Sequence, residues 1–97
     1  MMITFFKIDA RGLIHYYSIS NRQGHLFSPY TFTASWGVAL SAGREKQFVF
    51  DSQDELDRKL RDLIASRIRH GYRVLYSYFR YGEDHSLQPV LRRAAAS

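Results

Sequence analysis

The chain has 97 residues and a formal net charge of +5. Its hydrophobic content of 45% and aromatic content of 15% exclude the polar, aromatic-poor composition of a disordered chain. It has no cysteine, so disulfides and thiolate metal sites are excluded and one hydrophobic core must stabilise the fold. We expect a cytoplasmic protein with no membrane partner, because the sequence shows no secretion signal and no run of the ~20 apolar residues that span a bilayer.

Four segments before residue 52 have the pattern of β-strands. In residues 30–36, aromatic and small apolar side chains alternate with threonine and serine, which is the period of a strand with one buried face. Residues 44–50 alternate as well, with Phe48 and Phe50 on the same side as Arg44 and Lys46. Residues 4–9 and 14–20 are expected to form two more strands, because turn-forming residues separate them.

The strongest helix signal covers residues 53–70. Ser52 and Glu55 have the spacing of a capping box, in which each satisfies a free backbone N–H at the start of the helix. Leucine and isoleucine then recur at steps of three and four residues and form one apolar stripe. Gly71 stands where a left-handed cap is expected to end the helix.

A fifth strand is expected over residues 72–80, where Val74, Tyr76 and Tyr78 alternate with Leu75 and Phe79. Both of its faces are apolar or aromatic, so either the strand lies between two covered faces or one tyrosine face is open to a partner. We predict one domain over residues 1–82, of the α+β class, in which an antiparallel sheet of about four to five strands packs on one main helix. Residues 83–97 are expected to form a flexible or short helical tail.

The sequence offers few groups for catalysis or metal binding. The four histidines, including His25 and His85, lack the spacing of metal ligands. The chain has no serine in a nucleophile elbow and no glycine-rich phosphate loop. We therefore expect no enzyme activity, no cofactor and no metal.

Basic residues are concentrated towards the C-terminal half of the chain. Residues 58–80 contain one acid, Asp62, whereas residues 51–57 are rich in acids. The bases of this region are Arg58, Lys59, Arg61, Arg67, Arg69, Arg73 and Arg80. Acids at the start of a helix and bases at its end complement the helix dipole, and the same bases can attract phosphate groups. The two interpretations are compatible.

Several of these features together resemble the WGR domain. They are the pair Trp36 and Gly37, Gly43 six residues later, a Phe-Val-Phe strand, the capped helix and the run from Arg67 to Tyr72. The resemblance covers about residues 16–74. The family is named after a Trp-Gly-Arg motif and occurs in DNA-dependent poly(ADP-ribose) polymerases and in small bacterial proteins. Its fold combines an antiparallel sheet with one main helix.

The resemblance implies roles for particular residues. In the polymerases the motif tryptophan packs near the sugar at a DNA end, and basic neighbours contact the terminal phosphates. Trp36 and Gly37 take the motif positions here, and Val38 and Leu40 stand where the family has arginine and glycine. The candidate phosphate contacts are Arg44, Lys46, Arg67 and Arg69. Strand alternation places Trp36 on the side of the core, whereas its position at a strand end before glycine allows contact with a ligand.

Two functions of different classes follow. The first is a non-enzymatic module that binds nucleic acid, with duplex DNA at an end or nick as the partner. Its site comprises Trp36, Gly37, Arg44, Lys46, Arg67, Arg69 and Arg73. The alternative is a protein-interaction or self-association module that uses Val38, Leu40, Tyr76 and Tyr78.

Overall fold

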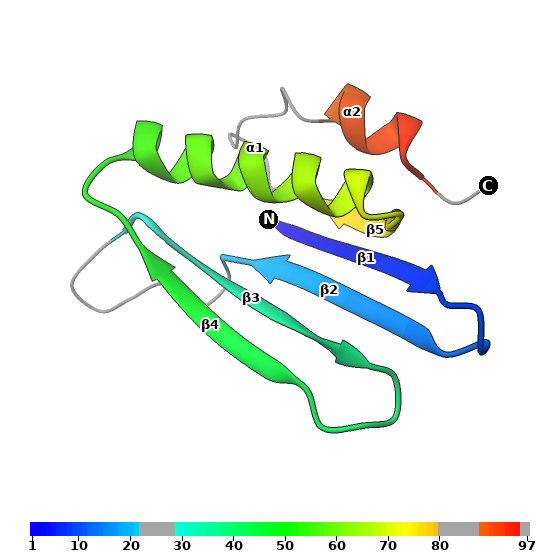
Figure 1. Cartoon of the computed structure of the whole chain (residues 1–97). Helices are drawn as coiled ribbons and strands as arrows, with labels where there is room; N and C mark the ends of the chain where they lie inside the picture. Colours follow the sequence, from blue (N-terminus) through cyan, green and yellow to red (C-terminus); the bar gives the residue numbers. More distant parts are fainter. Residues whose placement is uncertain (22–28, 80–87, 96–97) are drawn as a thin grey trace.

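The computed structural model describes residues 1–21, 29–79 and 88–95 of the chain (Figure 1). Its elements in chain order are β1 (Met2–Ile8), β2 (Ile14–Ser20), β3 (Thr31–Val38), β4 (Arg44–Val49), α1 (Gln53–Arg69), β5 (Arg73–Tyr78) and α2 (Gln88–Arg93). Residue 80, at the predicted end of the fifth strand, and residues 83–87 of the predicted tail lie outside the described residues. Neither described helix is long and apolar enough to cross a membrane.

The five strands form one antiparallel sheet in the order β4-β3-β2-β1-β5. The first four strands follow one another as neighbours. Helix α1 then carries the chain diagonally over one face of the sheet, from β4 at one edge to β5 at the other (Figure 1). The predicted α+β class, with an antiparallel sheet on one main helix, is confirmed. We call the side that α1 covers the helix face, and the other side the far face.

The ends of α1 follow from its capping residues. The Ser52 hydroxyl accepts a hydrogen bond from the backbone N–H of Glu55 (3.2 Å), and the Glu55 carboxylate accepts one from the N–H of Asp51 (3.1 Å). At the other end Gly71 has a φ of +89°, which lets the N–H of Tyr72 reach the carbonyl of Arg67 (3.0 Å). The helix therefore ends within one residue of the predicted position.

The core lies between α1 and the helix face of the sheet. Leu56, Leu60 and Ile64 of α1 are buried and belong to one apolar cluster with the strands. The strand side chains of this cluster include Ile3, Phe5, Tyr17, Ile19, Phe32, Ala34 and Val74. Leu91 of α2 is 1% exposed and completes the cluster next to β5, so a residue of the predicted tail is part of the core.

Strand β5 differs from the predicted alternation. Val74 pairs with Phe5 and is buried on the helix face, but Tyr76 pairs with Thr4 and therefore lies on the far face. The pairing register shifts between these two pairs, so one extra residue, Leu75, is inserted and reverses which side the following residues face. The N–H of Val74 also donates to the Ala94 carbonyl (2.8 Å), which holds this point of the strand against the chain after α2.

Two glycines make room for a tyrosine at the hairpin between β3 and β4. Tyr16 is the direct partner of Gly37 on the far face. A Cβ atom at Gly37 would lie 3.3 Å from the Tyr16 hydroxyl oxygen, and one at Gly43 would overlap that oxygen and approach the Trp36 carbonyl oxygen to 2.8 Å. The tyrosine ring thus lies over the base of the hairpin, and both glycines have a packing role.

We expect Gly43→Ala to lower the free energy of unfolding by about 1–3 kcal/mol, because the added methyl group meets backbone as well as a side chain. Denaturant unfolding measures the effect. Ser41→Ala, at an exposed position of the same hairpin, is the control and should change stability by less than ~0.5 kcal/mol. Equal stability of Gly43→Ala and the unmodified protein would contradict this packing role.

Candidate functional site

Trp36 lies on the helix face near the C-terminal end of α1. Strand pairing places it directly between Tyr17 on β2 and Arg44 on β4, with all three side chains on one side of the sheet. Its ring stacks on Tyr17 with 5.8 Å between the ring centres and 16° between the planes. Trp36 packs against the core cluster but is only partly buried. Its ring therefore has one side in the fold and leaves part of its surface accessible.

Arg67 of α1 reaches down to the same place. Its guanidinium carbon lies 4.9 Å from the centre of the Tyr17 ring and 5.6 Å from that of Tyr72. One terminal nitrogen donates to the Ser66 hydroxyl (3.3 Å), and the buried Nε has no hydrogen-bond partner. No carboxylate of the described residues forms an ion pair with Arg67. Burial raises the pKa of Tyr17, and the Arg67 charge partly opposes this rise.

Three lysines are also held over aromatic rings. The Lys7 ammonium lies 4.8 Å from the centre of the Tyr72 ring and donates to the carbonyl oxygen of His70 (3.4 Å). Lys46 and Lys59 approach Phe48 from β4 and α1, with 4.9 and 5.5 Å between ammonium and ring centre. Such contacts stabilise a cation by about 0.5–1 kcal/mol at exposed sites. The aromatic rings carry no negative charge, so each lysine keeps its full positive charge.

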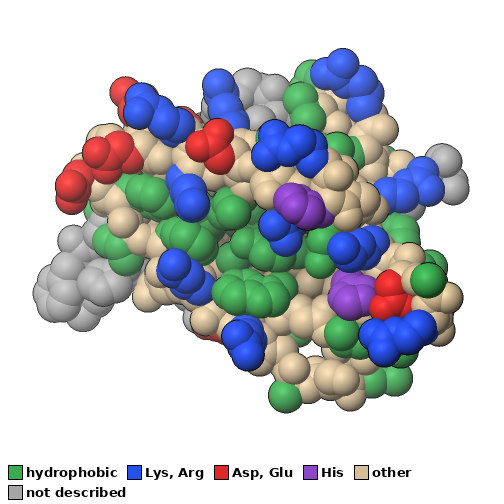
Figure 2. Space-filling view, in the orientation of Figure 1, with side chains coloured by type: hydrophobic (Ala, Val, Ile, Leu, Met, Phe, Trp, Pro, Cys, Tyr) green, Lys and Arg blue, Asp and Glu red, His purple; other side chains and the backbone are tan. Residues whose placement is uncertain are grey.

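These groups form one surface, which we call the cation–aromatic surface. It consists of Lys7, Arg44, Lys46, Lys59 and Arg67 with the rings of Tyr17, Trp36, Phe48 and Tyr72. Figure 2 shows a band of hydrophobic side chains along the lower side of α1, with basic side chains on both sides of the band. Most acidic side chains in this view gather at the N-terminal end of α1, away from that surface.

The structure brings together four of the predicted nucleic-acid contacts and separates three. Trp36, Arg44, Lys46 and Arg67 share the helix face. Gly37 does not, because it is the partner of Tyr16 on the far face.

Arg69 and Arg73 point elsewhere for different reasons. Arg69 is exposed and lies two residues after Arg67, which turns it about 200° around the helix axis. Arg73 pairs with Phe6 on the far face and donates to the carbonyl oxygen of Ala95 (3.3 Å).

The predicted protein-interface residues are also divided. Val38 is the partner of His15, which places it on the helix face with Lys7. Leu40 is fully exposed in the turn after β3, with a φ of +68°. Tyr76 and Tyr78 lie on the far face of β5, and β2 and β1 separate β5 from β3.

Sequence reasoning missed Lys7, Lys59, Tyr17 and Tyr72 as members of the surface. Lys59 had a detectable signal, because it precedes Leu60 at the border of the apolar stripe of α1. Lys7 had none, because its contacts are more than 60 residues away in the chain and depend on β5 pairing with β1.

A second cluster of charged groups closes the turn between β1 and β2. The Asp9 carboxylate accepts hydrogen bonds from the N–H groups of Arg11 (2.8 Å) and Leu13 (3.0 Å) and contacts Nε2 of His15 (2.9 Å). The hydrogen bond with His15 is the main cause that lowers the pKa of Asp9 to about 2. Because every partner is local, this cluster explains the turn and needs no ligand.

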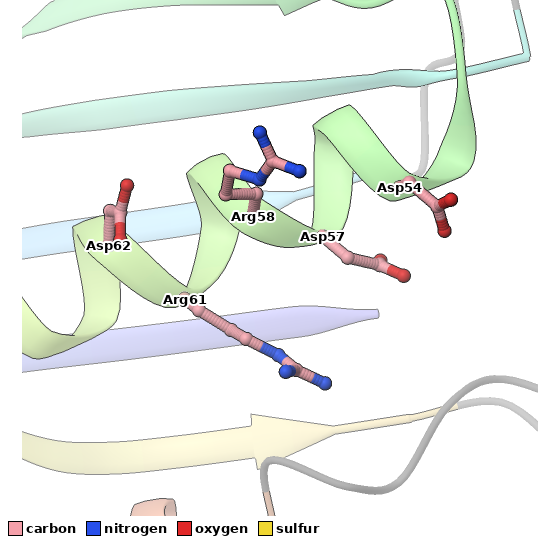
Figure 3. Close-up of a pocket in the computed structure, with 5 residues that line it drawn as sticks. All are labelled: Asp54, Asp57, Arg58, Arg61 and Asp62. Atoms are coloured by element: carbon pink, nitrogen blue, oxygen red, sulfur yellow. The ribbon is translucent and has the colours of Figure 1, made fainter.

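A shallow hollow on α1 is lined by Asp54, Asp57, Arg58, Arg61 and Asp62 (Figure 3). The five side chains spread outward from the helix and do not converge on one point. Its lining combines three acids and two bases, so it selects neither an anion nor a cation. No group of three or more His, Asp or Glu side chains in the described part of the chain could hold a metal ion, and His25 and His85 lie outside that part.

No family model, curated protein or solved structure matches this chain. The resemblance to the WGR domain therefore stays a prediction from the residues quoted above.

Removing the Asp9 carboxylate tests the turn cluster. Because folding lowers the pKa of Asp9, the ionised group stabilises the fold fully above about pH 4, and this stabilisation is lost as the pH falls towards 2. Asp9→Asn should therefore be less stable than the unmodified protein at pH 6, and most of the difference should be lost by pH 2. Urea unfolding across this range measures it. Arg11→Ala should change little, and a difference that stays constant with pH would contradict the assignment.

Proposed function

We propose that this protein is a non-enzymatic module that binds nucleic acid through the cation–aromatic surface. The arrangement of Arg67 carries the proposal. Its guanidinium is half-buried, lies over two tyrosine rings and has no carboxylate partner among the described residues. A phosphate group supplies the negative charge that this site lacks, and a guanidinium matches its geometry.

The remaining cations suit a backbone of repeated phosphates. Lys46 and Lys59 flank Phe48 from two different elements, and Arg44 extends the surface to the edge of the sheet. A protein that places several ammonium and guanidinium groups on one face gains affinity by releasing the counterions condensed on a nucleic acid. Because phosphates are the same at every step, we expect little sequence preference.

The accessible ring of Trp36 is better suited to a nucleic-acid end or nick than to an uninterrupted duplex. A ring with accessible surface can stack on a base or pack on a sugar, and such stacking contributes about 1–3 kcal/mol per base. Base faces inside a continuous duplex are covered by their neighbours, whereas the last base pair at an end exposes one face and the pairs beside a nick can unstack because one backbone is broken. The WGR resemblance, which places a DNA end near the motif tryptophan, supports the same assignment for Trp36.

Replacing Arg67 tests the phosphate contact. Arg67→Ala should weaken binding to every duplex sequence alike and reduce the slope of log affinity against log salt by about one. Fluorescence anisotropy with labelled duplexes at several salt concentrations measures both quantities. Arg58→Ala removes the same charge from the opposite side of α1 and is the matched control. An unchanged affinity and slope in Arg67→Ala would remove Arg67 from the site.

The single tryptophan reports on the end preference. A blunt, 5′-phosphorylated duplex should change Trp36 emission and bind in a salt-sensitive manner, whereas a closed DNA circle of the same sequence should bind more weakly and leave the emission unchanged. Trp36→Phe should reduce this difference in affinity between the two DNAs. If the protein binds neither DNA at low salt, the proposal that it binds nucleic acid is wrong. If it binds both DNAs equally, only the proposed preference for ends is wrong.

A further inference from the structure

The far face of the sheet has a different chemistry from the helix face. Tyr76 and Tyr78 are each 51% exposed on it, and Val49 at the other edge is 52% exposed. Its charged strand residues, among those described, are Arg73 near one edge and Glu45 near the other. The far face therefore combines exposed aromatic surface with little net charge, on a chain whose formal charge is +5.

Strand pairing aligns the far-face side chains in rows that cross all five strands. One row, from β5 to β4, contains Tyr76, Thr4, Ser18, Ser35 and Glu45. The next contains Tyr78, Met2, Ser20, Thr33 and Gln47. Each row begins with a phenol that can donate a hydrogen bond and ends with a side chain that can accept one. In the first row the side chains between them are short hydroxyls, and in the second they are Met2 and two short hydroxyls.

We propose that a second copy of this chain docks on the far face, related by a two-fold axis parallel to the strands. This axis reverses the strand order, so each row of one copy faces the same row of the other in the opposite direction. Tyr76 then meets the Glu45 carboxylate of the second copy and Tyr78 meets the Gln47 amide, while Ser18 at the centre meets its own counterpart. In both rows the donor at one end thereby meets the acceptor at the other.

Charge complementarity favours this axis and this partner. Arg73 lies one row from Tyr76, so the β5 edge of one copy brings its guanidinium near Glu45 of the other. A two-fold axis perpendicular to the strands would place β4 over β4 and oppose like charges. Face-to-face docking also leaves the cation–aromatic surfaces on the two outer sides, where their positive charges are farthest apart.

The size of the face sets the strength of the association. Five strands about 4.8 Å apart and two rows about 7 Å apart cover roughly 340 Å² of sheet per copy, less than half the area that a standard interface buries on each partner. We therefore expect a reversible dimer with a dissociation constant in the micromolar to millimolar range.

Reversing the charges of Glu45 and Arg73 tests the proposed arrangement of the two copies. Sedimentation equilibrium of the full chain should show a concentration-dependent dimer. Glu45→Arg and Arg73→Glu should each raise the dissociation constant at least five-fold, and the double exchange should restore it. Asp62→Arg is the control: it makes the same charge change as Glu45→Arg, but at an exposed position of α1, and should leave dimerisation unchanged. A protein that stays monomeric at millimolar concentration, or a Glu45→Arg variant that dimerises like the original, would overturn the proposal.

Cross-linking provides a second measurement that does not depend on the stability of charge variants. Because the chain has no cysteine, Glu45→Cys and Tyr76→Cys can be introduced into separate copies and mixed under oxidising conditions. A disulfide-linked heterodimer should form faster than in a mixture of Asp62→Cys with Tyr76→Cys. Equal rates in the two mixtures would overturn the face-to-face arrangement. Neither experiment involves DNA, so their outcomes are independent of the proposed function.

Discussion

The hydrophobic contact between α1 and one face of the sheet organises this fold. Leu56, Leu60 and Ile64 can be buried only if α1 crosses the strands that carry Ile3, Ile19 and the rest of the buried cluster. This crossing takes the chain from one edge of the sheet to the other, so it also decides that β5 pairs with β1. The two faces of the sheet then acquire different chemistry, because only one of them is covered by α1.

The helix face illustrates why cations over aromatic rings differ from cations in salt bridges. A carboxylate beside Arg67 would neutralise it, whereas Tyr17 and Tyr72 stabilise the guanidinium and leave its charge available to a ligand. Removing Arg67 partly from water costs free energy that the rings offset only in part. A site of this kind is therefore suited to an anion that arrives later, and the phosphates of a nucleic acid meet this requirement.

Local patterns in the sequence were sufficient to predict most of the elements. The alternation in residues 30–36 and 44–50 and the capping residues of α1 are signals between near neighbours, and both the class of fold and the extent of the helix are confirmed. The prediction that Val74, Tyr76 and Tyr78 share one face of β5 was wrong. A bulge at Leu75 inserts one residue between Val74 and Tyr76, which reverses the alternation. The sequence also did not predict that Leu91 is buried, because a six-residue helix is too short to show a clear hydrophobic periodicity.

The amino-acid sequence is enough to indicate which segments form strands and which form the helix, because these follow from side-chain periodicity and capping within a few residues. It also determined an excess of basic residues. The three-dimensional fold places some of these bases on one side of the sheet: Lys7, Lys46 and Arg67 come from β1, β4 and α1 and share the helix face. It likewise decided that Arg73 and Tyr76 face the other side, because the direction of a strand side chain depends on pairing register, which is a contact between distant parts of the chain.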